Sequence, residues 1–221
     1  MYNFHLDISN TCTLKCGECI RQILPGKMDK PSMGGKNLPL EDFKKIADAC
    51  NWLSFNGQVS DPIFNPNFID MLRYLNDHTD PKWHRYNSIY TSATTKKRSR
   101  DWYKEAFEVN KDFKWFFGID GLPHQSHQYR QGQDGVFLFE MMCIAAEMGN
   151  NTCWQYIIFN YNENDIEEAK SMANNNGIDF LLTQSSRWKD RDGKPDPFRP
   201  TGKYKQTLAD KLPNRRLYEE Y

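Results

Sequence analysis

The sequence of 221 residues has no apolar run near the roughly twenty residues that a membrane-spanning helix needs, and its mean hydropathy is -0.81. Its first residues, MYNFHLDISN, contain no basic segment followed by an apolar stretch, so no secretory signal is predicted. Net charge is also absent, because Lys and Arg together number 29 and Asp and Glu together number 29. This balance gives no indication of nucleic acid or a membrane surface as a partner. We therefore expect a soluble, cytoplasmic protein.

Apolar and aromatic residues are present in ordinary amounts. Hydrophobic residues make up 38% of the chain and aromatic residues 14%, which is enough to bury a core and argues against a disordered polypeptide. The length predicts one domain, or one domain with an appendage.

Six cysteines are present, but their distribution does not suggest three disulfides. Three lie within eight residues, at Cys12, Cys16 and Cys19, whereas the other three are scattered. We expect Cys50 and Cys143 on helix faces and Cys153 at the start of a strand, all as core residues. The closely spaced trio requires a different explanation, because three thiolates on one loop repel each other unless a cation or metal cluster neutralises them.

Strand-like and helix-like segments alternate along most of the chain. Hydrophobic periodicity and turn residues predict strands at 4–9, 52–57, 85–94, 114–121, 153–161 and 178–184, with helices at 38–51, 67–78, 99–110, 135–150 and 165–177. Ser99 is expected to cap the third helix and Gly177 to end the last one. This order predicts an α/β fold with parallel strands, either a doubly wound sheet or an incomplete (β/α) barrel. Residues 186–221 break the pattern, so we expect a core domain at 1–185 and a C-terminal tail.

The cysteine trio has the spacing CxxxCxxC and directly follows the first predicted strand. Three thiolates can bind three irons of a cubane cluster, which leaves the fourth iron with an open coordination site. The alternative is a zinc site with a histidine as fourth ligand. None of the five histidines stands at zinc-finger spacing from the trio, which favours the cluster.

This spacing, at the end of the first strand of a β/α chain, resembles the radical S-adenosylmethionine (SAM) superfamily, and the resemblance extends through about residues 4–185. Residues 57–62, GQVSDP, are similar to the Gly-Gly-Glu-Pro segment of that family, with Ser60 in place of the second glycine and Asp61 in place of the glutamate. Residues 91–93 are a weaker match to its Thr-Asn-Gly. Residues 117–123, 129–132 and 154–164 resemble the SPASM-associated branch.

The resemblance implies a partial (β/α)6 barrel with its site at the carboxyl ends of the strands. It implies a [4Fe-4S] cluster bound by Cys12, Cys16 and Cys19, and SAM as a second cofactor. Reductive cleavage of SAM would give a 5′-deoxyadenosyl radical that takes a hydrogen atom from a substrate. An electron donor such as flavodoxin or ferredoxin is implied as a partner. The residues implied to bind SAM are Gly57, Ser60, Asp61, Pro62, Thr91, Arg130 and Asn160, with Asp120 as a polar catalytic residue.

Particular roles follow for some of these residues. Asp61 and its preceding backbone would bind the ammonium group of SAM, and Arg130 would form a salt bridge to its carboxylate. Asn160 would contact the adenosine. The residues alone leave alternatives open, because Arg130 could be a surface arginine and Asp120 could cap a turn.

The sequence departs from the branch that it most resembles. No cysteine follows Cys153, so the chain cannot build the auxiliary clusters of that branch. The tail at 186–221 is locally basic and is expected to pack on or near the barrel opening. The resemblance suggests a peptide or protein substrate, with a small nucleotide or sugar as the alternative. A non-catalytic iron–sulfur module and a zinc-dependent binding protein are the remaining alternatives.

Overall fold

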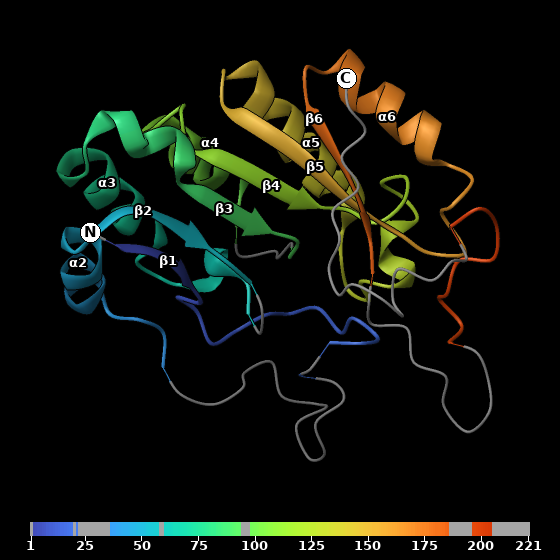
Figure 1. The fold of residues 1–221 in the computed structure, drawn as a ribbon, viewed down its shortest axis with the longest axis horizontal. Coiled ribbons are helices and arrows are strands. Elements are labelled where there is room, and N and C mark those ends of the chain that lie inside the picture. The colour runs from blue at the N-terminus through green and yellow to red at the C-terminus, as the bar shows by residue number, and fades with distance from the viewer. Residues whose placement is uncertain are drawn as a thin grey trace.

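The computed structural model describes residues 2–19, 21, 36–57, 60–93, 98–185 and 196–204. Six parallel strands form one sheet whose spatial order follows the chain (Figure 1). The strands are β1 (Tyr2–Leu6), β2 (Cys50–Phe55), β3 (Ser88–Thr91), β4 (Lys114–Gly118), β5 (Asn151–Ile158) and β6 (Asp179–Gln184). The helices are α2 (Leu40–Asp48), α3 (Phe68–His78), α4 (Arg100–Val109), α5 (Gly135–Glu147) and α6 (Ile166–Asn175), with short 3-10 helices η1 (Pro62–Phe64), η2 (Pro81–Tyr86) and η3 (Ser126–Gln128).

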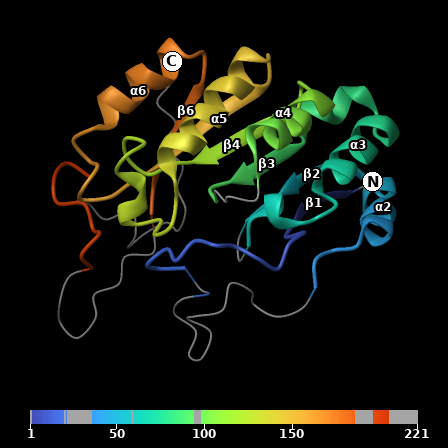
Figure 2. The same ribbon diagram turned by 180° about the vertical axis from the view of Figure 1, so that it is seen from behind.

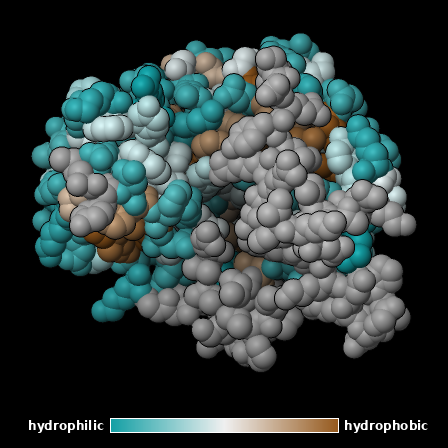
Figure 3. All heavy atoms as spheres, viewed as in Figure 1, coloured by the Kyte–Doolittle hydropathy of each residue, from teal (hydrophilic) through white to brown (hydrophobic). Residues whose placement is uncertain are grey.

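The position of the helices relative to the sheet distinguishes between the two expected architectures. Helices α2 to α6 lie along one face of the sheet, and the sheet curves away from them (Figures 1 and 2). A doubly wound sheet would have helices on both faces. The described part of the chain therefore forms an α/β partial barrel of six strands, as expected. Figure 3 shows the face opposite the helices, which is hollowed near its middle. No described helix is long and apolar enough to cross a membrane.

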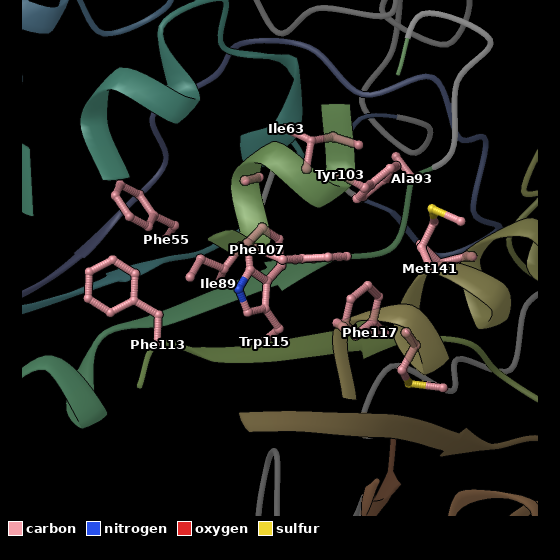
Figure 4. Packing of buried hydrophobic residues seen from close by; sticks show 14 of the residues in the cluster. Phe55, Ile63, Ile89, Ala93, Tyr103, Phe107, Phe113, Trp115, Phe117 and Met141 are labelled. Atoms are coloured by element: carbon pink, nitrogen blue, oxygen red, sulfur yellow. The ribbon is translucent and has the colours of Figure 1, made fainter. Parts of the chain in front are cut away.

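The hydrophobic core lies between the sheet and its helices. Trp115 and Phe117 of β4 point toward the helices and are fully buried (Figure 4). The ring of Phe107 from α4 meets that of Trp115 edge-on at 4.9 Å between centroids. Because side chains alternate along a strand, the other residues of this stretch, Phe116 and Gly118, lie on the opposite, inner side of the sheet. This alternation separates a packed outer layer from an inner surface that is available for a site.

Local signals set several helix ends as the sequence predicts. Ser99 accepts a hydrogen bond from the backbone N–H of Trp102 and caps α4. Gly177 follows α6 with a φ of 66°, a left-handed conformation that glycine adopts without a steric cost.

Several expected boundaries are wrong, and three of them affect how the site is read. The first strand ends at Leu6, so residues 7–9 belong to the loop that follows. Cys50 begins β2 and does not lie on a helix face, because α2 ends at Asp48. The third strand is shorter than expected, since Pro81–Tyr86 forms η2 with the Asp80 side chain capping its first turn.

A described part of the tail, residues 196–204, packs against the turn between β5 and α6. Phe198 places its ring edge-on to Tyr129, with centroids 5.2 Å apart. The Glu163 carboxylate accepts hydrogen bonds from the backbone N–H groups of Thr201 and Gly202. We call residues 196–204 the strap. The rest of the tail, residues 186–195 and 205–221, lies outside the described residues, so the domain division at 185 stays a prediction.

Candidate functional site

A cavity of about 620 Å³ opens where the strands end. Its wall combines loops that follow the strands with side chains on the inner face of the sheet. The lining residues are His5, Cys12, Leu14, Cys16, Cys19, Arg21, Asn56, Gly57, Ser60, Asp61, Tyr90, Ser92, Tyr129, Arg130, Gln155, Ile157, Phe159, Thr183, Gln184 and Ser185. The carboxyl ends of parallel strands are where such sheets bind ligands.

The cysteine loop follows β1, and all three of its thiols line this one cavity. Each of the three cysteines is half-buried. Arg21 fixes the loop from inside, because its guanidinium donates hydrogen bonds to the carbonyls of Cys12 at 2.8 Å and Leu14 at 3.4 Å. The sequence shows Arg21 only as one more basic residue near the trio, so its role was missed.

Burial keeps two of the thiols protonated in the absence of a metal. Desolvation, reinforced by the nearby Asp61 carboxylate, raises the pKa of Cys12 to about 12. Desolvation also raises the pKa of Cys16 to about 11, although the positive charge of Arg130 opposes this shift. Binding of a metal would displace these protons, since only thiolates are metal ligands.

The donor set fits an iron–sulfur cluster by its chemistry. Within the described ranges, no three Cys, His, Asp or Glu residues are grouped closely enough to bind one metal ion. A cubane cluster makes a different demand, because each of its thiolates binds a separate iron and the sulfurs do not converge on one point. Three thiols around one cavity meet that demand.

The segment after β2 lines the cavity and folds back tightly on itself, so that the Ser60 carbonyl lies against Gly57. A Cβ on Gly57 would lie 2.5 Å from the carbonyl oxygen of Ser60, so only glycine allows this close approach. The Ser60 hydroxyl donates to Asp7 at 3.1 Å, which accommodates serine at the position where the family has glycine. Pro62 is buried and begins η1 directly after Asp61.

Asp61 joins the loops that follow β2 and β3. Its carboxylate accepts hydrogen bonds from the backbone N–H groups of Ser92 at 2.8 Å and Ala93 at 2.9 Å, and from the Thr91 hydroxyl at 3.0 Å. A further bond comes from the N–H of Ile63 at 3.3 Å. Burial raises the pKa of Asp61 to about 6, against the opposing effect of these donors. The expected SAM-binding residues Asp61 and Thr91 are thus brought together, but they bind each other.

Arg130 and Asp120 form a buried ion pair beneath the cavity. Nε of Arg130 donates to Oδ2 of Asp120 at 2.7 Å, and the exposed fractions of the two side chains are 12% and 0%. Burial raises the pKa of Asp120, although Arg130 opposes the shift. Burial by itself would lower the pKa of Arg130, but Asp120 and Cys16 raise it overall, so the guanidinium remains charged.

Four of the predicted site residues, Pro62, Thr91, Asp120 and Asn160, are not among those that line the cavity. Asp120 is fully buried and its second carboxylate oxygen accepts from the N–H of Ile157 at 3.0 Å, so it holds Arg130 in place, and its expected catalytic role stays a prediction. Asn160 lies in the turn after β5, and its amide donates to the carbonyl of Pro197 in the strap at 2.6 Å. This bond gives Asn160 a partner in the strap, and its expected contact with adenosine stays a prediction.

Sequence reasoning also missed Gln133, which connects the strand ends. Its amide donates to the carbonyls of Gly118, at 2.9 Å, and Ser92, and its oxygen accepts from Ser126. The hydroxyl of Ser126 in turn accepts from the N–H of Asp120 at 2.8 Å. A lone glutamine in a polar loop carries no sequence signal for this role.

Comparison with known proteins gives similarity in structure only. No family model matches the chain, and no curated protein matches it. The structure of Streptococcus suis SuiB is similar over 90% of this chain, with a TM-score of 0.65 and 16% sequence identity. The structure of anSMEcpe with bound AdoMet covers 93% of this chain with a TM-score of 0.57 and 16% identity. TYW1 with a lysine-pyruvate adduct bound covers 88% with a TM-score of 0.54 and 10% identity.

The chain is shorter than these proteins. It spans 42% of the SuiB chain and 55% of the anSMEcpe chain. SuiB and anSMEcpe both have structures with S-adenosylmethionine (AdoMet) bound. Agreement across most of this chain, with a three-cysteine loop after the first of six parallel strands, shows that this protein has the radical SAM fold.

Proposed function

We propose that this protein is a radical SAM enzyme that acts on a peptide or protein. The observation that carries the proposal is the meeting of three loops at one cavity, which brings the three thiols together with Gly57, Asp61 and Arg130. A [4Fe-4S] cluster held by Cys12, Cys16 and Cys19 would supply the electron that cleaves SAM to methionine and a 5′-deoxyadenosyl radical. A donor such as flavodoxin or ferredoxin would reduce the cluster.

We assign separate tasks to the residues that would surround SAM. The Ser60 carbonyl, exposed to close approach by Gly57, is the acceptor for the SAM ammonium, because the Asp61 oxygens already accept from other donors. Asp61 therefore fixes the carbonyl-bearing loop and adds negative charge nearby. Arg130 presents its remaining N–H groups to the SAM carboxylate, while Asp120 holds the guanidinium in place. Thr91 and Pro62 act on SAM only through Asp61.

A peptide substrate is supported by two similar structures. SuiB bound to precursor peptide SuiA covers 82% of this chain with a TM-score of 0.63, and anSMEcpe with AdoMet and Cp18Cys peptide covers 82% with a TM-score of 0.57. The expected small nucleotide or sugar is the second candidate. We propose further that residues 186–221 form a tail that packs near the cavity mouth. The strap supports this proposal, because Phe198 packs on Tyr129, which lines the cavity.

The test begins with anaerobic reconstitution of the full chain. Iron and sulfide should approach one cubane per chain, and added SAM with a reductant should give 5′-deoxyadenosine and methionine. Replacing Cys12, Cys16 and Cys19 together by Ala should abolish both results. Replacing Cys50 and Cys143 by Ala is the matched control, since neither lines the cavity, and it should leave both results intact. Retention of iron by the triple variant, or zinc in place of iron, would refute the proposal.

A further inference from the structure

A chain of hydrogen bonds crosses the inner face of β1, β2 and β3. The hydroxyl of Ser54 donates to Oδ1 of Asn56 at 3.0 Å, and the hydroxyls of Ser54 and Ser88 are 2.8 Å apart. Nδ2 of Asn56 lies 3.0 Å from Nδ1 of His5. The four side chains thus form one continuous series from Ser88 to His5.

The direction of this series fixes the proton on His5. Because Ser54 donates to Asn56, Ser54 accepts from Ser88. The same bond orients the Asn56 amide, so that its NH2 group faces His5 and donates to Nδ1. A ring nitrogen that accepts a hydrogen bond carries no proton, so the imidazole is held as the tautomer with its proton on Nε2.

His5 lines the cavity and its side chain is exposed, so the Nε2–H group is open to a ligand. Its ring lines the cavity and is oriented by Trp52, which meets it edge-on at 5.9 Å between centroids. Among the described residues Nε2 has no hydrogen-bond partner, whereas both ring nitrogens of the buried His84 have one. The arrangement fixes a donor without supplying its acceptor.

Two uncharged polar side chains from β5 and β6 also line the cavity. Gln155 on β5 also faces it, and no hydrogen bond of its side-chain amide occurs within the described part of the chain. The Thr183 hydroxyl on β6 is likewise without a partner there. Both are uncharged. A ligand lying between β1 and β5 would meet a donor on one side and an amide on the other.

We propose that His5 and Gln155 form a substrate-binding subsite for an uncharged amide-bearing chain, a peptide backbone. An extended peptide backbone repeats these groups along its length, so one C=O can accept from Nε2–H of His5 on β1 and an N–H several residues away can donate to the Gln155 oxygen on β5. This subsite rests on the proposed function for its role in turnover, but its binding chemistry is independent of the cluster.

The first experiment observes the tautomer directly. Long-range proton–nitrogen NMR on the full chain should show the proton of His5 on Nε2. His84 should show the same tautomer and His78 the opposite one, because Nδ1 of His78 donates to the carbonyl of Tyr74. Asn56→Asp should move the His5 proton to Nδ1 and leave the other two unchanged. A proton on Nδ1 of His5 in the unaltered protein would overturn the proposal.

The second experiment measures binding with capped hexapeptide amides whose side chains are uncharged. Saturable shifts of the His5 ring signals, without shifts of His84, are expected. His5→Phe and Gln155→Leu should each raise the dissociation constant at least fivefold, and Gln128→Leu on the exposed η3 should leave it unchanged. If Asn56→Asp does not fold, Ser54→Ala serves instead, since loss of that donor frees the Asn56 amide and should populate both tautomers.

The outcomes separate this proposal from the proposed function. Failure of SAM to bind, with peptide shifts at His5 intact, would refute the function and leave the subsite standing. SAM binding without any peptide response at His5 would refute the subsite alone. A response to adenosine monophosphate in place of the peptides would replace the peptide by a nucleotide and so overturn the proposal.

Discussion

The Arg130 guanidinium reaches the Asp120 carboxylate across Gly118, whose missing side chain leaves room for it. A Cβ on Gly118 would lie 2.9 Å from Nη2 and 3.2 Å from Cζ of Arg130, and it would also overlap the Ser92 hydroxyl. The ion pair and the glycine are therefore one structural unit, because the bond at 2.7 Å requires the open space.

Replacing Asp120 by Asn should destabilise the protein strongly. It leaves the buried Arg130 without a counter-charge, and breaking such a pair costs about 3–5 kcal/mol. The free energy of unfolding from urea titration measures this loss. Asp70→Asn is the matched control, since its pair with Arg73 at 3.1 Å is exposed, and it should change the free energy little. Equal effects of the two substitutions would show that burial of the Asp120 pair is unimportant.

Gly118→Ala should displace Arg130 and lower the free energy of unfolding by about 1–3 kcal/mol, the usual cost of overpacking. Ser92→Gly removes one of the two contacts that the new methyl group would make. The double variant should therefore recover part of the loss, which a double-mutant cycle measures. Strict additivity of the two changes would contradict the packing shown here.

The raised pKa of Asp61 predicts that the stability of the protein depends on pH. Its pKa is raised from 3.8 to about 6 by burial, so the folded state binds the proton more tightly than the unfolded state. Its contribution to stability is fully present below pH 3.8 and is lost as the pH rises through about 6. The loss amounts to at most about 3 kcal/mol, from two pKa units at 1.36 kcal/mol each.

Urea titration of the reduced, iron-free chain between pH 4 and pH 7 tests this sign, with Asp61→Asn as the comparison. The unaltered protein should lose stability relative to the variant as the pH rises through that window. A difference between the two that stays constant with pH, or that grows in favour of the unaltered protein, would rule out the raised pKa.

The strap should loosen when Phe198 is replaced by Ala. Its ring packs on Tyr129 and Phe159, and its carbonyl accepts from the N–H of Asn160 at 3.1 Å. We expect faster hydrogen exchange of the Asn160 amide, about tenfold for each 1.4 kcal/mol lost in local stability. The backbone amide of Ile119, which donates to the backbone carbonyl of Gln155 at 3.2 Å, should exchange at its original rate. Unchanged exchange at Asn160 would show that the strap does not depend on the ring.

The sequence predicts the fold well because the fold depends on periodicity. Alternation along residues 114–118 places Trp115 and Phe117 on one face, and the structure buries both against the helices. The same reasoning misplaces the end of the fifth strand, because β5 ends at Ile158 and the alternation of a strand does not continue into the turn that holds Asn160. The predicted strand extended three residues too far.

Long-range pairing limits what the sequence could predict about the site. Asp120 and Arg130 are visible as suitable residue types, but nothing in the sequence shows that they neutralise each other across Gly118. His5 and Asn56 are separated by 51 positions and meet only because β1 and β2 pair in register. Their contact depends on the register of two strands, which one sequence does not specify.

The strand order has a consequence for biosynthesis. Each described strand pairs with the strands next to it in the chain, so the sheet can grow one β–α unit at a time as the polypeptide leaves the ribosome. Cys12, Cys16 and Cys19 are synthesised before Arg130 and β5, which follow more than a hundred residues later. The thiols are therefore present on the nascent chain before Arg130 and the β5 residues that complete the cavity around them. If these thiols bind a cluster, as proposed, its insertion is a late event of maturation, and the thiols have to stay reduced until translation is complete.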